Sequence, residues 1–158
     1  MQRVWELRIA KRNESKVKQL GGVEVGENHY FLFILLHVAF FICLIVETKV
    51  LHTQLLTSEG IILWIIFICT QVFRIWCIQS LGIYWNTKII IVPHHKRVTR
   101  GPYQFVNHPN YMIVAIELYI IPMLVGAYIT AVIFPVLHVL LLCIRIPAEN
   151  EALRKLNP

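Results

Sequence analysis

The residues best suited to chemistry lie in two short polar stretches that interrupt a very apolar chain. The first, "RGPYQFVNHPNY" at residues 100–111, combines turn-forming residues with a histidine, two asparagines and two tyrosines. Gly101 and Pro102 predict a turn. Pro109 favours an extended His108 and can itself begin a helix, whose free N–H groups would favour a carboxylate or another polar ligand group. An ordinary loop followed by a helix start explains the same residues without a ligand.

The second polar stretch is "RIPAENEAL", residues 145–153, which follows the last apolar run. Arg145 and Glu149 are four residues apart and could pair on one helix. Pro147 lies between them, so a helix break near Ile146 is equally compatible with the sequence. The alternative without a ligand is an arginine whose long side chain reaches water, followed by a solvated tail. If both stretches lie at the same membrane face, they could line one cavity.

Two charged residues, Arg74 and Glu117, lie inside apolar runs. Because a charge inside a membrane is costly, such residues indicate either a functional site or a structural ion pair. His94 and His95 are adjacent, which is poor geometry for a shared metal ion, so we predict no metal site. The sequence has no GxGxxG, Walker or GxSxG pattern, and a soluble nucleotide-binding domain is therefore not indicated.

The composition indicates a membrane protein of one domain, residues 1–158. Hydrophobic residues make up 57% of the chain, and the mean hydropathy is +0.62. The net charge of +6 comes from basic residues clustered between apolar runs, a pattern typical of membrane proteins rather than of nucleic-acid binding. The four cysteines lie within apolar runs without CxxC spacing, and we expect buried, reduced thiols.

The apolar runs predict an all-α integral membrane protein with about four transmembrane helices. Crossing about 30 Å of hydrocarbon takes roughly 20 helical residues. The region from Tyr111 to Ile146 is too long for one crossing, so we predict a tight hairpin that turns at "VGAY" (125–128). The predicted helices cover residues 31–47, 61–79, 111–125 and 128–146.

The basic residues predict the orientation of these helices. Apart from Arg74, every Lys and Arg except Lys49 falls before the first helix, between the second and third, or in the tail from Arg145 onward. The positive-inside rule then places both termini in the cytoplasm and the protein in the cytoplasmic membrane. Residues 82–110 and 145–158 would form one cytoplasmic region for a cofactor and substrate.

Residues 1–30 are predicted to form a cytoplasmic segment with an amphipathic helix on the membrane surface. Its weak apolar face would comprise Val4, Leu7, Ile9 and Val17. The opening "QRVWEL" is equally compatible with the end of a helix that begins earlier.

"GPYQFVNHPNY" and "RIPAENEAL", one helical hairpin apart, resemble the paired signature of the isoprenylcysteine carboxyl methyltransferase family. That signature is similar to GPYxxxRHPxY followed by RxxxEExxL, and the resemblance covers roughly residues 81–153. The matching positions are Gly101, Pro102, Tyr103, His108, Pro109, Tyr111, Arg145, Glu149 and Leu153. Asn107 and Asn150 depart from it, standing where the family has Arg and Glu.

The resemblance implies an integral membrane methyltransferase that uses S-adenosyl-L-methionine and releases S-adenosyl-L-homocysteine. By it, Glu149 and the matching residues of the first motif would form the cofactor site. The front of the chain resembles a bacterial branch associated with O-methylation of lipophilic polyketide products such as alkylpyrones. We therefore expect a small lipophilic acceptor with an acidic oxygen, which Arg145 would hold, with Arg145 and Glu149 as the catalytic residues.

Two alternatives to this function stay open. The acceptor could instead be the C-terminal S-isoprenylcysteine carboxylate of a protein, as the family name implies. A non-enzymatic transporter subunit or lipid-binding scaffold would use Arg74 and Glu117 as a polar pathway. The sequence predicts a lipid bilayer and a small-molecule substrate as partners and no nucleic acid, and it leaves the oligomeric state open.

Overall fold

The computed structural model describes residues 2–50, 60–95 and 98–156. Lys96 and Arg97, which belong to the predicted cytoplasmic loop, lie outside the described residues. The elements in chain order are α1 (Gln2–Gln19), β1 (Val23–Val25), α2 (Glu27–Val50), α3 (Gly60–Leu81), the 3-10 turn η1 (Gly82–Tyr84), β2 (Ile89–Ile91), the 3-10 turn η2 (Gly101–Gln104), α4 (Pro109–Leu124) and α5 (Tyr128–Leu156).

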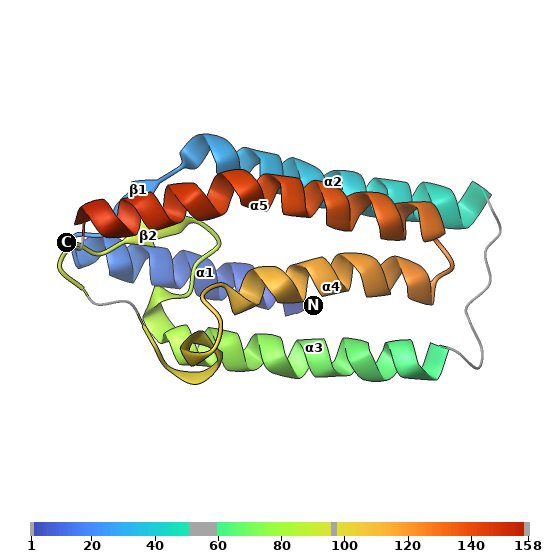
Figure 1. The fold of residues 1–158 in the computed structure, drawn as a ribbon, viewed down its shortest axis with the longest axis horizontal. Coiled ribbons are helices and arrows are strands. Elements are labelled where there is room, and N and C mark those ends of the chain that lie inside the picture. The colour runs from blue at the N-terminus through green and yellow to red at the C-terminus, as the bar shows by residue number, and fades with distance from the viewer. Residues whose placement is uncertain (1, 51–59, 96–97, 157–158) are drawn as a thin grey trace.

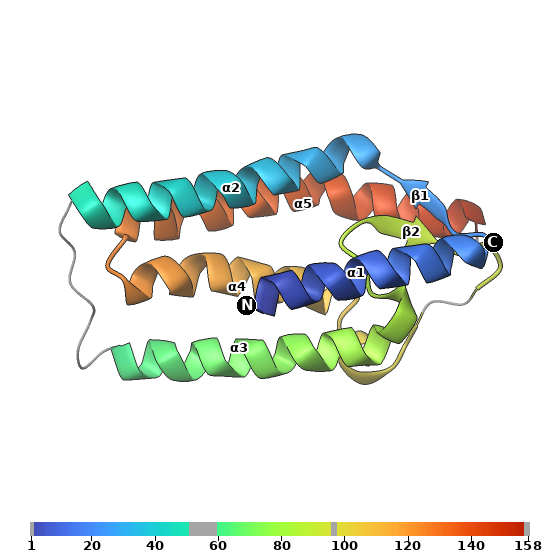
Figure 2. The ribbon, with the colours of Figure 1, turned by 180° about the vertical axis from the view of Figure 1, so that it is seen from behind.

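Four helices, α2 to α5, run side by side and form the body of the molecule (Figure 1). α5 packs against α2 and α4, and α3 packs against α4 (Figure 2). The main apolar core lies where three of these helices meet. It comprises Leu36 and Phe40 from α2, Val114 and Leu118 from α4, and Phe134 from α5.

The outer faces of the bundle are also apolar, which identifies a membrane protein. α2, α3 and α5 are each long and apolar enough to span a bilayer, yet only 22%, 22% and 28% of their most apolar windows are buried within the protein. Apolar surface of this extent needs lipid rather than water around it. The structure is therefore an all-α membrane protein, with three candidate spans among the residues described.

The third predicted helix, residues 111–125, corresponds to α4, which has 16 residues. At 1.5 Å per residue it is about 24 Å long, less than the roughly 30 Å of a hydrocarbon core. The four-crossing topology therefore stays a prediction.

The cysteine prediction was wrong for three of the four residues. Cys77 is buried within the protein, whereas Cys43, Cys69 and Cys143 are exposed on its surface. An apolar run alone does not show which side of a helix faces the protein and which faces lipid.

α4 and α5 are joined by a short turn at residues 125–127. The turn includes Gly126 in the left-handed region, with φ of 72°. The carboxylate of Glu47, near the end of α2, accepts hydrogen bonds of 2.8 Å from the backbone N–H groups of Ile129 and Thr130. Because the first N–H groups of a helix have no partner within it, this contact caps α5 and ties it to α2.

α5 runs without a break through Pro147 to Leu156. Of the two possibilities that the sequence left open, the structure has the continuous helix. Arg145 and Glu149 therefore lie on the same helix, one turn apart.

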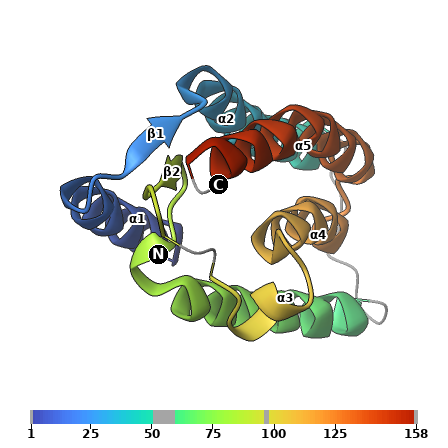
Figure 3. The same ribbon diagram turned by 60° about the vertical axis from the view of Figure 1, so that its left-hand side comes forward.

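A short antiparallel sheet, which the sequence pattern did not predict, joins β1 to β2. Val23 pairs with Ile91, and Val25 pairs with Ile89. Ile89 and Ile91 also pack against Ala152 of α5. The sheet therefore holds the loop after η1 against the C-terminal end of α5, as the view in Figure 3 shows.

The predicted membrane-surface face of α1 stays a prediction, although Val17, which it includes, is buried within the protein. Val4 and Leu7 are more than half exposed, at 54% and 56%. The buried residues of α1 instead form a stripe that includes a carboxylate and an amide: Glu6, Ala10, Asn13 and Val17.

Asn13 explains why a polar residue is buried on α1. Its Nδ2 donates to the carbonyl oxygens of Gly82, at 3.0 Å, and Trp85, at 2.8 Å. These two bonds attach α1 to η1 and to the residue that follows it. α1 thereby supports the loop that carries one wall of the cavity described next.

Candidate active site

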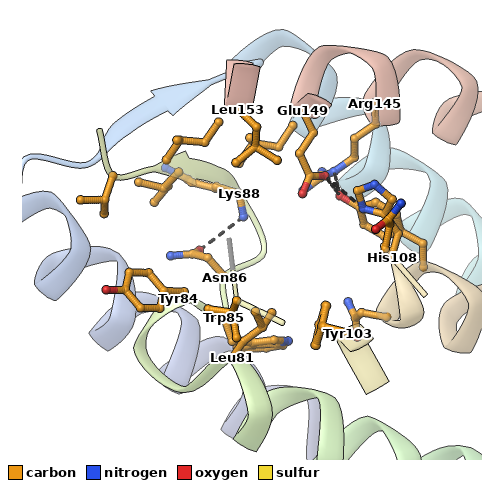
Figure 4. A pocket seen from close by; sticks show the side chains of 18 of the residues that line it. Leu81, Tyr84, Trp85, Asn86, Lys88, Tyr103, His108, Arg145, Glu149 and Leu153 are labelled. Atoms are coloured by element: carbon orange, nitrogen blue, oxygen red, sulfur yellow. Dashed lines mark hydrogen bonds and ion pairs between the residues drawn. The ribbon is translucent and has the colours of Figure 1, made fainter. Parts of the chain in front are cut away.

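The candidate site is a cavity at the end of the bundle where the sheet and the C-terminal part of α5 meet. The space within it and at its open mouth, solvent included, measures about 970 Å³. Five of the sequence-predicted site residues line it: Tyr103, His108, Tyr111, Arg145 and Glu149. The two polar stretches, far apart in the sequence, thus meet at one cavity (Figure 4).

Arg145 and Glu149 are connected through a tyrosine hydroxyl. Nε of Arg145 donates to the hydroxyl oxygen of Tyr111 at 2.8 Å, and this hydroxyl donates to Oε2 of Glu149 at 2.6 Å. Nδ1 of His108 lies 3.8 Å from the same carboxylate oxygen. The rings of His108 and Tyr111 are stacked, with centroids 5.3 Å apart. The four side chains therefore form one continuous polar wall.

Arg145 is held from several sides and is only 6% exposed. Its Nη2 donates to the carbonyl oxygen of Thr87 at 2.7 Å. Its guanidinium lies over the ring of Phe33, at 4.9 Å from the centroid, and over that of Tyr111, at 5.5 Å. These contacts orient a charge that would otherwise be costly to bury. A guanidinium has five N–H donors, so its two hydrogen bonds do not exhaust its capacity.

Gly101, Pro102 and Pro109 lie behind the cavity rather than along its wall. Gly101 has a φ of 58°, and a Cβ at this position would come within 2.1 Å of Oγ of Ser80. Only glycine therefore allows the turn to sit this close to α3. Pro102 and Pro109 are buried, and Pro109 is the first residue of α4. These three residues shape the turn and the helix start that bring the polar residues to the cavity.

Two cavity residues that sequence reasoning missed carry buried polar atoms in need of a partner. Nε1 of Trp85 and Oδ1 of Asn110 have no hydrogen-bond partner among the described residues. Leaving such atoms unpaired costs free energy, and both atoms have almost no accessible surface. A single tryptophan in a loop gives no sequence signal that its indole nitrogen will be buried without a partner. Asn110, by contrast, lies within the first motif.

Lys88 also lines the cavity and belongs to a cluster with two glutamates. Its Nζ lies 2.9 Å from Glu24 and 3.0 Å from Glu14. The hydrogen bonds to Glu24 and then Glu14 raise the pKa of Lys88. The hydrogen bond from Lys88 is the largest cause of the lowered pKa of Glu24, and that from Lys18 is the largest cause for Glu14. The cluster ties α1 and β1 to the cavity wall.

Arg74 and Glu117 form a buried pair away from the lining of the cavity. Nε of Arg74 donates to Oε1 of Glu117 at 3.0 Å, and Nη2 of Arg74 donates to Oε2. Gln71 donates to the same carboxylate at 2.8 Å, and Glu6 of α1 lies 3.6 Å from Nη1 of Arg74. Of the two interpretations of these charges, the contacts favour a structural ion pair.

The two departures from the family signature lie in different places. Asn107 lines the cavity, whereas Asn150 is exposed and does not line it. Only the change at Asn107 therefore alters the chemistry of the cavity wall directly.

The model of the isoprenylcysteine carboxyl methyltransferase (ICMT) family matches residues 61–155. The chain belongs to this family. An uncharacterized protein of Bacillus subtilis, YpbQ, is 41% identical over 155 residues, which cover 98% of this chain and 92% of the relative. An uncharacterized protein of Haemophilus influenzae is 31% identical over 163 residues, which cover 99% of this chain and 91% of that protein. No solved structure matches the chain significantly.

Family membership and the apolar helices together identify a membrane methyltransferase of the ICMT type. The family match includes the whole lining of the cavity. α1, β1 and α2 lie before the matched residues, yet Phe33 of α2 and Asn13 of α1 support the site from there.

Proposed function

We propose that this ICMT-family protein transfers a methyl group from S-adenosyl-L-methionine to a small lipophilic acceptor with an acidic oxygen, such as an alkylpyrone-like enol. The observation that carries the proposal is the polar wall of Arg145, Tyr111, Glu149 and His108, at the end of a bundle with apolar outer faces. A polar donor and a lipid-dissolved acceptor can meet only at such a boundary.

The cavity residues fit the chemical groups of the cofactor. Glu149 lines the cavity, and its carboxylate can accept hydrogen bonds from an ammonium group. S-adenosyl-L-methionine, when bound, supplies a methyl group made electrophilic by its sulfonium. The site residues then have to align donor and acceptor at about 3–3.5 Å and limit the water around the reacting atoms.

Arg145 is proposed to hold the acceptor oxygen. Its guanidinium stays charged at any working pH, so it can bind an oxyanion without taking its proton. A carboxylate or an acidic enol would reach the site already ionised, whereas a neutral hydroxyl would need a base. Asn107 removes a cation that the family signature has beside His108, which supports an acceptor other than the one that gives the family its name.

Methyl transfer to a panel of acceptors tests the proposal. Purified protein in lipid nanodiscs would receive methyl-labelled S-adenosyl-L-methionine with alkylpyrones, lipophilic phenols or prenylcysteine analogues, and the product would be identified by mass spectrometry. We expect the enols to be methylated fastest. Faster methylation of a prenylcysteine analogue would instead show that the protein is an isoprenylcysteine carboxyl methyltransferase. Absence of saturable cofactor binding would contradict the proposal and favour the alternative of a non-enzymatic transporter subunit or lipid-binding scaffold.

The role of Arg145 is tested by the kinetics of Arg145→Lys and Arg145→Ala. We expect a large fall in kcat/KM for the acceptor with little change in the cofactor Kd, because lysine keeps the charge but loses the planar fork. Arg154→Lys, on the exposed end of α5, is the matched control. If Arg145→Lys loses cofactor binding but keeps normal acceptor kinetics at saturating cofactor, Arg145 belongs to the donor site.

The proposed orientation places both termini in the cytoplasm. A single cysteine at position 155, in a cysteine-free background, should react only with reagents that reach the cytoplasmic side. Lys155 is exposed, so its substitution should leave the fold intact. Labelling from the opposite side would contradict the proposed topology.

A further inference from the structure

His138 is a buried polar residue on α5 that does not belong to the cavity wall. Its side chain is 1% exposed. Its Nε2 lies 3.4 Å from the carbonyl oxygen of Tyr111, and because a carbonyl can only accept, this nitrogen carries the proton and donates. Nδ1 has no hydrogen-bond partner within residues 2–50, 60–95 and 98–156. A buried ring with one long hydrogen bond and one unsatisfied nitrogen costs stability, so packing alone does not account for it.

The contacts of His138 lead to Arg145 by two routes. α5 packs against both α2 and α4 (Figure 1), and His138 contacts a residue on each. On α4 it bonds the backbone of Tyr111, whose hydroxyl accepts the 2.8 Å hydrogen bond from Nε of Arg145. On α2 its ring meets that of Phe33 edge to face, with the centroids 5.9 Å apart. The guanidinium of Arg145 lies over this same Phe33 ring.

We propose that His138 is a positioning residue for the guanidinium of Arg145 and acts through Tyr111 and Phe33. The inference rests on the proposed function, in which Arg145 holds the acceptor oxygen. Arg145 lies two helical turns beyond His138, about 10 Å along α5, so the effect is indirect.

Each route restrains one support of the guanidinium. The hydrogen bond to the carbonyl of Tyr111 holds the start of α4 against α5, and with it the place of the Tyr111 hydroxyl. The edge-to-face contact holds the tilt of the Phe33 ring beneath the guanidinium. A misplacement of about 1 Å at a reacting centre can cost about 100-fold in rate, so weak restraints of this kind matter to catalysis.

His138→Phe separates positioning from packing. Phenylalanine keeps an aromatic ring beside Phe33 and removes the donor to Tyr111. Because it also removes the unsatisfied Nδ1, we expect unfolding in detergent micelles to show equal or higher stability. We expect kcat/KM for the acceptor to fall about 3- to 10-fold, with an unchanged Kd for S-adenosyl-L-homocysteine. Lower stability with normal kinetics would show a merely structural residue and overturn the proposal.

A rescue variant and a packing control accompany this test. His138→Gln keeps an N–H donor for the carbonyl of Tyr111, so its kcat/KM should lie closer to wild type than that of His138→Phe. Equal losses in the two variants would overturn the proposal, because the donor would then have no role. Phe134→Leu, one turn earlier on α5 and part of the main core, is the matched control. It should lower stability and leave kcat/KM unchanged.

A double-mutant cycle shows whether the effect depends on Arg145. Arg145→Lys already lacks the planar guanidinium, so adding His138→Phe should lower kcat/KM no further. Losses that add fully in the double variant would show that His138 acts elsewhere and would overturn the proposal.

A measurement without substrate keeps this inference distinct from the proposed function. The Nε–H proton of Arg145 is hydrogen-bonded and buried, so its exchange with water, followed by ¹⁵N NMR and assigned with Arg145→Lys, should be slow in the wild type. We expect faster exchange in His138→Phe, or in His138→Leu should the first variant not fold, and unchanged exchange in Phe134→Leu. Unchanged exchange in the His138 variant would overturn the positioning role. Faster exchange there, in a protein whose wild type transfers no methyl group, would support that role and overturn the proposed function alone.

Discussion

Two buried arginines, Arg74 and Arg145, each lie near a glutamate, but the two clusters are built differently. Arg74 contacts Glu117 directly through two nitrogens. Arg145 and Glu149 instead share the hydroxyl of Tyr111. The first pair lies within the bundle and away from the cavity lining, whereas the second forms part of the cavity wall.

The difference shows what each cluster is suited to do. A direct pair satisfies both charges and gains most by staying closed, which is a structural role. A tyrosine placed between the charges keeps them apart, so each can still bind a ligand group of opposite charge. The predictions below test this contrast, from the largest expected effect to the smallest.

Arg74→Met should have the largest effect on stability. Removing the arginine leaves Glu117 and Glu6 buried without their shared cation, and breaking a buried pair typically costs about 3–5 kcal/mol. Chemical unfolding in detergent micelles would measure the loss. Lys49→Met, at an exposed position, is the control.

Two further results sharpen the test of Arg74. The double variant Arg74→Met/Glu117→Met should recover part of the stability, because it removes one of the two uncompensated charges. Normal stability of Arg74→Met combined with lost cofactor binding would place Arg74 in the functional site and contradict the contrast.

Glu149→Ala and His108→Ala should weaken cofactor binding and leave stability nearly unchanged, which is the opposite of the effect expected for Arg74→Met. We expect cofactor affinity to fall about 10- to 150-fold, the equivalent of about 1.5–3 kcal/mol for a charge-assisted contact, with a nearly unchanged unfolding midpoint. Calorimetric titration with S-adenosyl-L-homocysteine and unfolding of the same samples would measure both. Asn150→Ala, exposed on the same helix, is the matched control. Unchanged affinity in both folded variants would exclude a cofactor role for these residues.

Tyr111→Phe tests the shared hydroxyl itself. The variant keeps the ring that stacks on His108 but lets Arg145 and Glu149 approach each other. We expect about a 3- to 10-fold loss in kcat/KM, with a change in stability of less than about 1 kcal/mol. Tyr119→Phe on the same helix, where Tyr119 is 45% exposed, is the control. A stability loss as large as that of Arg74→Met would show that the hydroxyl is structural.

The cluster of Lys88, Glu14 and Glu24 should give the smallest effect, because its side chains are partly exposed. The folded state lowers the pKa of both glutamates below 4.5. Their contribution to stability is therefore present above pH 4.5 and is lost as the pH falls through the folded-state pKa. Glu24→Gln should lose less stability than wild type between pH 6 and pH 3.5, by at most about 1 kcal/mol.

Thermal unfolding at several pH values would measure this difference. Glu151→Gln serves as a comparison, because Glu151 pairs with Lys155 on the exposed surface of α5. An equal pH dependence in wild type and Glu24→Gln would show that Glu24 does not contribute.

The membrane class, the helical bundle and the polar site residues could be predicted from the sequence because their signals are local. A long apolar run indicates a membrane helix wherever it packs, and Gly101, Pro102 and Pro109 restrict the backbone through their own covalent structure. The family motifs likewise identified Tyr103, His108, Tyr111, Arg145 and Glu149, which all line the cavity. Their individual roles stay predictions.

Only the tertiary structure decided how these residues are connected. The burial of Glu6 and Asn13 on α1 depends on Arg74 and on the carbonyl of Trp85, about 70 residues later in the chain, so hydropathy alone does not reveal the buried face of α1. The hydroxyl between Arg145 and Glu149 comes from a different helix, and no spacing on α5 reveals it. The indole nitrogen of Trp85 has no hydrogen-bond partner among the described residues, and only the side chains that folding places around the ring show this. Local patterns determine which elements form, whereas partners brought together by folding determine which polar atoms are satisfied and which remain for a ligand.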